Sequence, residues 1–222
     1  LYVARNKALE ISSGEFITFL DVDDELTIDS IEKRVDLLKT TKKEICISNL
    51  YISKNFRKKK PHYSKTNKPN LDFSSLLEKY NICFLSAMFR KKIFVKFKFN
   101  HNYNILGDYD LMLNLSNKYE IQYSDIYSGT YNIHINNYTH KNLSSHVKET
   151  RKWFITNCFT LLKNRKKLKV PIIKNYIVLN QTEKIIKSNL IRTFKYFICK
   201  KKNFLYFRIL KKFILFKLLK ND

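Results

Sequence analysis

The sequence contains few of the residues that form tight turns, with only three glycines and three prolines in 222 residues. Glycine-rich phosphate-binding loops are missing, because neither a GxGxxG nor a P-loop pattern occurs. No signal peptide and no long uncharged apolar run is visible, so we expect no segment to span a membrane. The four cysteines lie far apart without CxxC spacing: Cys46, Cys83, Cys158 and Cys199. We therefore expect reduced thiols rather than a zinc site or a disulfide framework.

Acidic residues are nearly absent from the last third of the chain. Residues 151–222 hold 20 of the 43 Lys and Arg residues and only two acids, a net charge of +18, whereas residues 1–150 carry +6. A hydrophobic content of 44% and an aromatic content of 14% exclude a disordered polar chain. The length allows one domain with a sizeable core, or one domain with an appendage. We predict a domain over residues 1–147 and a basic helical tail over residues 148–222.

Hydrophobic periodicity predicts alternating strands and helices before residue 145. The predicted strands are Glu15–Asp21, Glu44–Ile52, Phe84–Arg90 and Tyr123–His134, the last ending in a turn. The predicted helices are Ala4–Ser12, Thr27–Lys39, Leu71–Tyr80 and Asp108–Tyr119, with a helical turn at Lys91–Val95. The second helix is expected to bury one stripe of Ile28, Ile31, Val35 and Leu38. Lys54–Pro69 is expected to be a loop or an exposed hairpin. The alternation indicates an α/β layer structure.

Three carboxylates, Asp21, Asp23 and Asp24, directly follow the first predicted strand. Side chains two residues apart point the same way in an extended chain, so Asp21 and Asp23 could converge on one ion. Two hard oxygen ligands suit Mg²⁺ or Mn²⁺, which takes its remaining ligands from water and substrate phosphates. The alternative is an acidic turn that caps the helix beginning at Thr27. The buried strand immediately before the acids favours the metal site.

Two further features have both structural and functional interpretations. Asp108 and Asp110 lie in the first turn of a predicted helix, where an aspartate usually caps the helix and complements its dipole. A carboxylate there could instead accept a proton from an attacking hydroxyl. His134 closes the run Tyr131–His134, and its spacing from other histidines matches no zinc motif.

Taken together, these motifs resemble the family 2 glycosyltransferases of GT-A fold. The first block has Ala-Arg-Asn at 4–6, Gly-Glu-Phe-Ile at 14–17 and Phe-Leu-Asp-Val-Asp-Asp at 19–24, in the order and near the spacing typical of that family. Further similar segments are Ser86–Arg90, Phe99, Gly107–Leu111 and Tyr131–His134. The resemblance spans residues 2–146. It implies an α/β, Rossmann-like nucleotide-sugar transferase domain.

The resemblance also implies a role for individual residues. Asp21 and Asp23 would bind a divalent cation, Mg²⁺ or Mn²⁺, on the pyrophosphate of a nucleotide-sugar donor, with Asp24 as a neighbour. Asp108 would be the general base that deprotonates the acceptor hydroxyl, so that attack on the anomeric carbon inverts its configuration. Arg5 would approach the donor. His134 would reach the metal or the phosphates.

The chain departs from the family pattern in three places. Gly107 stands where the acid before the base usually lies, and Asn132 replaces the usual arginine. The opening half of the family domain, with its first strands and the aspartate that binds the base, has no counterpart here. The first residue is Leu1 rather than Met. We therefore expect a GT-A domain that lacks its first strands and is truncated at its N-terminus.

The basic tail mixes lysine with Phe, Ile and Leu, and Phe204–Leu219 is apolar over much of its circumference. A basic amphipathic helix of this kind can lie on an anionic membrane surface. The alternative is an ordinary helical appendage packed on the catalytic domain. Charge and aromatic residues also suit nucleic acid, but no recognisable binding motif supports it, so nucleic acid is not the expected partner.

The sequence thus predicts a metal-dependent inverting glycosyltransferase that builds a surface polysaccharide or lipopolysaccharide. Its partners would be a nucleotide-sugar donor and a glycan or lipid-linked acceptor. We expect a cytoplasmic location, with peripheral contact to an anionic membrane through residues 151–222. The rival hypothesis is a catalytically inactive basic module that binds an anionic membrane surface or nucleic acid.

Overall fold

The computed structural model describes residues 1–164 except 56 and 65. The chain divides into two compact units, Leu1–Glu149 and Thr150–Asp222. The predicted amphipathic helix Phe204–Leu219 lies outside the described residues. Among the helices in the described part, none is long and apolar enough to cross a membrane. The first unit contains every predicted site residue.

Short strands and helices alternate along this unit, as the periodicity predicts. The helices are α1 (Tyr2–Ile11), α2 (Ser30–Thr41), α3 (Phe73–Glu78), α4 (Gly107–Lys118), α5 (Tyr138–Lys141) and α6 (Leu143–Asn164), with 3₁₀ turns at Phe84–Ser86 and Lys91–Val95. The strands are β1 (Phe16–Thr18), β2 (Glu25–Leu26), β3 (Ile45–Lys54), β4 (Lys59–Pro61), β5 (Ala87–Arg90) and β6 (Ile121–Ile133).

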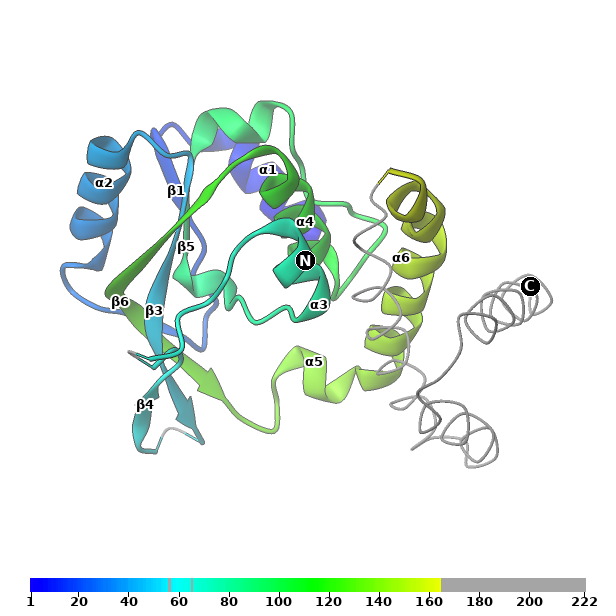
Figure 1. Ribbon diagram of the computed structural model, residues 1–222. Coiled ribbons are helices and arrows are strands. Elements are labelled where there is room, and N and C mark those ends of the chain that lie inside the picture. Colours follow the sequence, from blue (N-terminus) through cyan, green and yellow to red (C-terminus); the bar gives the residue numbers. More distant parts are fainter. Residues whose placement is uncertain (56, 65, 165–222) are drawn as a thin grey trace. The chain divides into compact units, whose positions relative to one another are not determined.

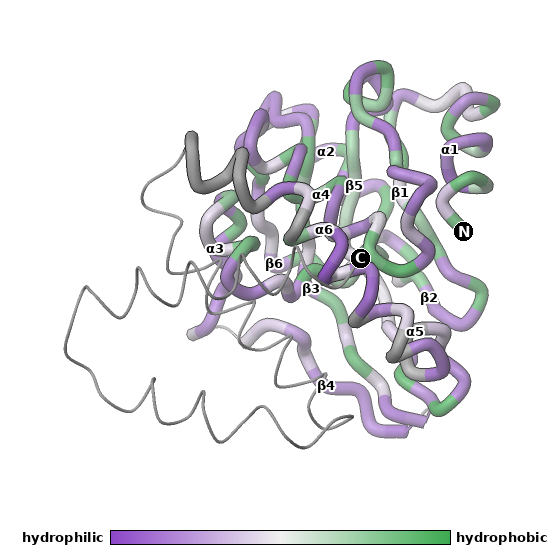
Figure 2. Tube along the Cα trace, turned by 90° about the vertical axis from the view of Figure 1, so that its right-hand side faces the viewer, coloured by the Kyte–Doolittle hydropathy of each residue, from purple (hydrophilic) through white to green (hydrophobic). Residues whose placement is uncertain are grey.

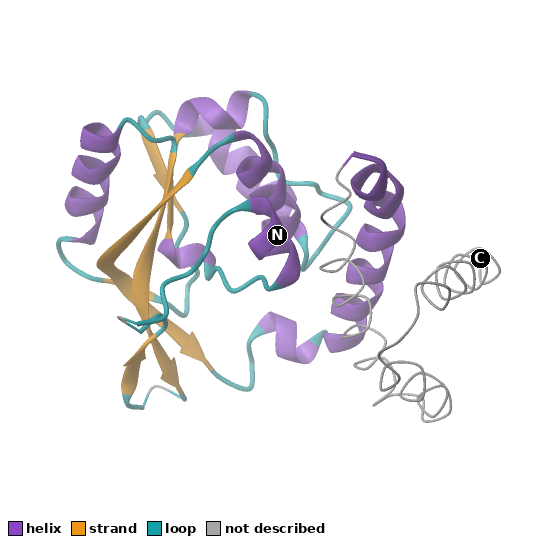
Figure 3. Ribbon diagram, in the orientation of Figure 1, coloured by secondary structure: helices purple, strands orange, loops and turns teal. Residues whose placement is uncertain are grey.

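The strands form one mixed sheet in the order β1-β5-β3-β6-β2, with β4 paired to β3. β3 and β6 run parallel, and the other pairs are antiparallel. Figure 1 shows α2 on one side of this sheet and α1, α3 and α4 on the other, and Figure 3 separates the same layers by colour. This confirms the predicted α/β layer structure.

The parallel pair of β3 and β6 carries an irregularity that matters for the site. Its register shifts between Ser48 and Asn49 and again between Asn49 and Tyr51. Ser48 pairs with Ser124 and Tyr51 pairs with Thr130. Between these two pairs β6 therefore contains more residues than β3. The hydroxyl of Ser128 donates to the carbonyl of Asn49 at 3.0 Å inside the irregular region. Beyond it the pairing is regular up to Lys54 and Ile133.

The buried face of α2 differs from the predicted stripe. Ile28 precedes the helix and is fully exposed, and Ile31 is also exposed. Of the predicted stripe, Leu38 is fully buried and Val35 packs against the same core cluster. The helix also buries Ser30 and Arg34. Arg34 is completely buried, and its guanidinium donates to the carbonyl of Ser30 at 3.1 Å and to the hydroxyl of Thr18 on β1 at 3.3 Å. The prediction was confirmed for Val35 and Leu38 and was wrong for Ile28 and Ile31, because the helix buries Ser30 and Arg34 in their place.

Two other elements refine the prediction. The strand expected over Phe84–Arg90 begins only at Ala87, because Phe84–Ser86 form a 3₁₀ turn. Lys54–Pro69 contains an exposed hairpin, in which β4 pairs antiparallel with the end of β3. The inward face of α4 is as predicted, with Leu111, Met112 and Leu115 buried.

An aromatic cluster fills the core below the end of β1. The ring of Phe19 lies 5.1 Å from that of Phe84 and 5.4 Å from that of Phe99, and Phe89 and Phe94 complete the cluster. Fully burying one such side chain stabilises a fold by about 1.5–3 kcal/mol. Because Phe19 comes just before Leu20 and Asp21, this packing fixes the point from which the acidic loop leaves the sheet.

Gly129 allows β2 to pair with β6, and we predict that Gly129→Ala destabilises the fold. Gly129 pairs with Leu26, and a Cβ added to it would overlap the backbone carbonyl of Glu25. Forced overpacking of this kind costs about 1–3 kcal/mol. The measurement is urea unfolding followed by circular dichroism. Gly14→Ala is the control, because its nearest new neighbour would be the Phe16 carbonyl at 3.4 Å. Equal midpoints for the two variants would contradict the prediction.

Candidate active site

The three acids lie in a turn between β1 and β2. The amide of Asp24 donates to the carbonyl of Asp21 at 3.1 Å, so the chain forms a turn here. The extended conformation predicted from the sequence is therefore wrong. Asp21 is exposed, whereas Asp23 and Asp24 are partly buried. The turn gives each carboxylate different partners. The positions of Asp21 and Asp23 are therefore set by a turn, not by the two-residue alternation of a strand.

Arg5 links the acidic loop to α4. It lies on the buried face of α1 with Tyr2 and is only 7% exposed. One guanidinium nitrogen lies 2.9 Å from Asp21 Oδ1, and the other lies 2.6 Å from Asp108 Oδ1. Aromatic rings surround the guanidinium at 5.2–5.8 Å: Tyr2, Phe19, Phe84 and Phe99. A cation over aromatic faces is attracted by the ring quadrupoles. The arginine predicted from the Ala-Arg-Asn motif thus joins the two predicted acids.

Asp108 lies in the first turn of α4, with its side chain 25% exposed. Burial raises the pKa of this carboxyl to about 6, against the opposing pull of the Arg5 guanidinium, which favours the charged form. Its Oδ1 is occupied by Arg5, whereas its Oδ2 makes no hydrogen bond with the described residues. A carboxylate with one anchored oxygen and one available oxygen has the arrangement that a general base requires.

Tyr2 explains why glycine precedes Asp108. The Tyr2 hydroxyl donates to the Ile105 carbonyl at 2.8 Å and accepts from the Asp108 amide at 3.3 Å. A Cβ on Gly107 would lie only 2.6 Å from atoms of the Tyr2 ring. An acid at position 107 would therefore collide with the ring that orients the start of α4. The departure from the family pattern at this position is a packing requirement of the chain.

Glu149 fixes the loop that leads into α4. Its carboxylate accepts from the amides of Asn104, Ile105 and Leu106 at 2.7–3.0 Å. Three charge-assisted hydrogen bonds to successive amides hold a loop more firmly than neutral ones do. Sequence reasoning missed this residue, because a single glutamate in an amphipathic helix has no distinguishing local pattern.

His134 lies against Asp23 at the end of β6. Its Nε2 donates to Asp23 Oδ2 at 2.9 Å, and its Nδ1 accepts from the amide of Asn136 at 3.2 Å. The side-chain amide of Asn137 also donates to Asp23 Oδ2, at 3.1 Å, and its Oδ1 accepts from the His134 amide. In this arrangement the histidine orients Asp23 and offers no free lone pair. Asn137 was missed by sequence reasoning; its only signal is its place three residues after the histidine.

Asn132 anchors the other side of the acidic loop. It is 3% exposed. Its backbone amide donates to Asp24 Oδ1 at 2.9 Å, and its side-chain amide donates to the Asp23 carbonyl at 2.7 Å. Burial raises the pKa of Asp24 to about 7, opposed by the hydrogen bond from Asn132. The asparagine that replaces the usual arginine therefore holds the loop itself.

The donor chemistry of Asp21 and Asp23 fits a hard divalent cation. Within the described part, Oδ2 of Asp21 and Oδ1 of Asp23 take part in no hydrogen bond. Carboxylate oxygens suit Mg²⁺ or Mn²⁺, which completes its shell with water and phosphate oxygens. The described residues contain no group of three or more His, Cys, Asp and Glu side chains placed around one ion. A cation here would depend on two carboxylates and on ligands from a substrate.

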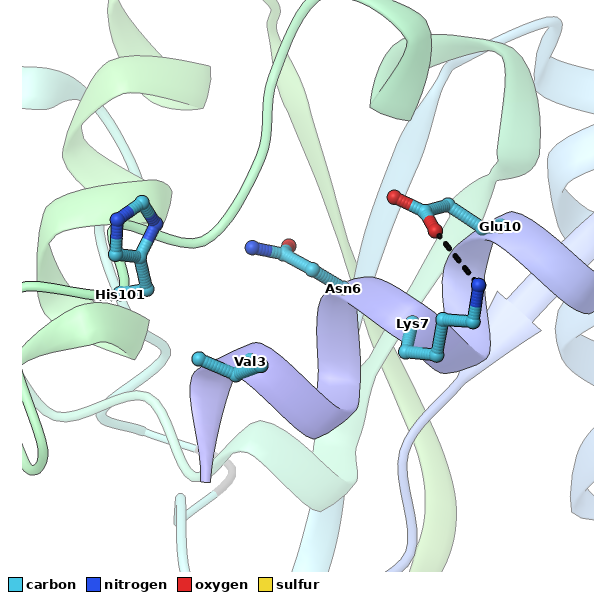
Figure 4. A pocket seen from close by; sticks show the side chains of 5 residues that line it. All are labelled: Val3, Asn6, Lys7, Glu10 and His101. Carbon is cyan, nitrogen blue, oxygen red and sulfur yellow. Dashed lines mark hydrogen bonds and ion pairs between the residues drawn. The ribbon is translucent and has the colours of Figure 1, made fainter.

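Two shallow hollows open on the surface of this unit. One, of about 310 Å³, is lined by Lys54, Asn55, Ile133, His134 and Ile135, so it borders the histidine of the candidate site. The other, of about 240 Å³, lies over α1 and is lined by Val3, Asn6, Lys7, Glu10 and His101 (Figure 4). Lys7 and Glu10 form an ion pair across its rim at 3.5 Å. The second hollow contains none of the predicted site residues.

The comparison with known families confirms the resemblance. Residues 1–97 match the sequence model of the family described as glycosyl transferase family 2. The match covers the Ala-Arg-Asn motif, the acidic loop and the strands β1, β3 and β5. Over residues 1–97 the chain is therefore similar in sequence to the family 2 glycosyltransferases.

One curated relative and several solved structures are similar to the chain. It is 32% identical over 115 residues to the Escherichia coli UDP-Glc:alpha-D-GlcNAc-diphosphoundecaprenol beta-1,3-glucosyltransferase WfaP, covering 52% of this chain and 44% of the relative. The fold is similar to S. aureus TarS residues 1–349, with a TM-score of 0.58 at 12% identity over 88% of this chain and 57% of that one. The same TarS segment in complex with UDP gives a TM-score of 0.54. The chain spans about half the length of these relatives, and the structural similarity confirms a GT-A fold.

We predict that Asn132→Ala lowers the free energy of unfolding by about 1–3 kcal/mol, because it leaves the Asp23 carbonyl without its buried donor. The measurement is equilibrium urea unfolding. Asn136→Ala is the matched control, since Asn136 is exposed and uses its backbone amide, not its side chain, to reach His134. Similar losses for both variants would mean that Asn132 does not anchor the loop.

Proposed function

We propose that the chain forms part of a metal-dependent, inverting glycosyltransferase that moves a sugar from a nucleotide-sugar donor to a glycan or lipid-linked acceptor, in surface polysaccharide or lipopolysaccharide synthesis. The observation that carries the proposal is the bridge from Arg5 to Asp21 and Asp108, which holds a candidate base beside the candidate donor acids. The relative named for UDP-Glc and a diphosphoundecaprenol-linked acceptor supports a UDP-sugar and a lipid-linked acceptor.

Asp108 would begin the reaction by accepting a proton from the acceptor hydroxyl at its free Oδ2. The acceptor oxygen then forms a bond to the anomeric carbon of the donor sugar. At the same time the bond from that carbon to the diphosphate oxygen breaks, and the nucleoside diphosphate leaves with the electron pair. Because attack and departure occur on opposite faces, the configuration at the anomeric carbon inverts. The proton remains on Asp108 until it passes to solvent.

The other site residues would bind and orient the donor. Asp21 and Asp23 are the proposed ligands of Mg²⁺ or Mn²⁺, which when bound neutralises charge developing on the diphosphate. Arg5 would add positive charge near the phosphates while keeping Asp108 in place. His134, our third candidate ligand, would in its present hydrogen bonding act by fixing Asp23. Asp24 would brace the loop through its bond with Asn132.

We predict that Asp108→Asn lowers kcat by on the order of 10²–10⁴-fold with little change in the KM for the donor, because an amide cannot accept the proton. The measurement is sugar transfer by the full chain with Mg²⁺ or Mn²⁺ present. Asp110→Asn, one half-turn further along the same helix, is the control and should keep most of the activity.

Robust sugar transfer by the Asp108→Asn variant would show that Asp108 is not the general base. Absence of transfer by the chain after it has been extended with the N-terminal half of a family 2 domain, together with retained binding to anionic vesicles, would favour the rival binding module.

The same base predicts the pH dependence of transfer. Burial raises the pKa of Asp108 from its usual value near 4 to about 6, so the reactive, deprotonated form is lost as the pH falls through about 6. The value of kcat/KM should be constant near neutral pH and should fall about tenfold per pH unit below pH 6. A kcat/KM that stays constant down to pH 5 would contradict this prediction. In the Asp108→Asn variant this acidic limb should disappear from the residual activity.

A further inference from the structure

A hairpin beside the candidate site carries an unusual concentration of positive charge. Residues 54–68 contain seven Lys and Arg residues and no Asp or Glu. β3 ends at Lys54, and β4 returns along it, pairing Lys59 with Ser53 and Pro61 with Tyr51. Residues 57–61 are exposed throughout. Figure 2 shows the hydrophilic trace of β4 at the lower edge of the view, below the label of β3. Lys54, Lys59 and Lys60 therefore lie in the two paired strands, and Arg57 and Lys58 lie in the segment between them.

Most of this charge lacks an acidic partner. Lys59 pairs with Glu25 at 3.0 Å, which ties the hairpin to the residue after the acidic loop. Lys68 pairs with Asp125 at 2.6 Å. Among the six of these residues that the structure describes, the other four form no ion pair with the described part of the chain: Lys54, Arg57, Lys58 and Lys60. Unpaired, exposed cations gathered on one hairpin attract an extended anionic surface.

Exposed apolar side chains follow the end of β6, the strand whose last residue lies beside this hairpin. The amide of Asn55 donates to the Ile133 carbonyl at 2.8 Å, which joins the hairpin to the end of β6. Ile135 is 85% exposed, and it lines the same hollow as Lys54. Tyr138, at the start of α5, is 58% exposed. Surfaces that enter a lipid headgroup layer combine exposed aliphatic and aromatic side chains with nearby cations. Ile135, Tyr138 and the unpaired cations of the hairpin provide this combination.

We propose that the hairpin and these side chains form a docking surface for an anionic lipid bilayer. The basic edge, as we call it, consists of Lys54, Arg57, Lys58, Lys60, Ile135 and Tyr138. The four cations would lie among the lipid phosphates, and Ile135 and Tyr138 would enter the headgroup layer. Nucleic acid fits less well, because an exposed isoleucine gains nothing from a phosphate backbone. The hollow lined by Lys54 and Ile135 also borders His134. Docking would therefore turn the candidate site toward the membrane. The value of this orientation rests on the proposed function, whereas lipid binding itself does not depend on it.

The test compares two triple variants of the full chain by flotation with vesicles. The first is Arg57→Gln, Lys58→Gln and Lys60→Gln. The control is Lys39→Gln, Lys42→Gln and Lys118→Gln, which removes the same charge. These control lysines precede β3 and β6, so they lie at the opposite end of the parallel pair. The vesicles contain phosphatidylcholine alone, or two parts phosphatidylcholine to one part phosphatidylglycerol.

We expect the hairpin variant to bind the anionic vesicles on the order of a hundredfold more weakly, since each basic residue near such a surface contributes roughly fivefold. The control should lose less than about threefold, and neither protein should bind phosphatidylcholine alone. Equal binding by the two variants would overturn the proposal and assign any lipid binding to other parts of the chain. Unchanged vesicle binding with loss of oligonucleotide binding would also overturn it, in favour of nucleic acid.

A second pair of variants tests the apolar contact separately from charge. Ile135→Ser should weaken binding to anionic vesicles severalfold, and the loss should persist at high salt, where charge is screened. Val95→Ser is the matched control, since Val95 is 82% exposed and follows β5 at the other end of the sheet. Equal affinities for these two variants would show that Ile135 does not enter the headgroup layer.

Discussion

The pairing of Arg5 with two carboxylates is the interaction on which the site and much of its scaffold depend. A buried guanidinium is costly to remove from water unless charged partners and hydrogen bonds compensate. Here Asp108 and Asp21 supply the negative charge, and four aromatic rings from separate parts of the chain surround the guanidinium. Removing the arginine would leave Asp108 buried beside no cation, a loss of about 3–5 kcal/mol for a broken buried pair. Helix packing and site electrostatics therefore rest on one side chain.

Much of this arrangement could be predicted from the sequence, and the reason lies in local patterns. The spacing of Leu111, Met112 and Leu115 reports burial directly, because helices repeat with a fixed period. The apolar run before Asp21 marks the position of β1, although that strand is only partly buried. Arg5, Asp21 and Asp108 were identified through motifs whose order along the chain is itself informative. The structure brings these three residues into one cluster, although Arg5 and Asp108 are 103 positions apart.

What could not be predicted depends on partners far away in the sequence. Arg34 is buried because Thr18 and Leu85 offer acceptors to it, and no periodicity within α2 reveals them. Asn132 and Asn137 bind the acidic loop across more than a hundred residues. The two departures from the family pattern have the same kind of cause. Glycine is required at position 107 because the Tyr2 ring lies against it, and Asn132 donates to the Asp23 carbonyl. Each residue matches a neighbour that is distant in the sequence, so neither could be explained from the local sequence alone.

The irregular register between β3 and β6 has a consequence for how this site can change. The extra residues that β6 carries opposite Asn49 decide how far along the sheet Asn132 lies when it meets Asp23 and Asp24. Inserting or deleting one residue there would displace Asn132 by about 3.3 Å, one strand step, which is more than a hydrogen bond tolerates. The acidic loop is thus sensitive to chain length in a strand about a hundred residues away. The conformation of the acidic loop can therefore be lost through substitutions within the loop, or through an insertion or deletion within β6.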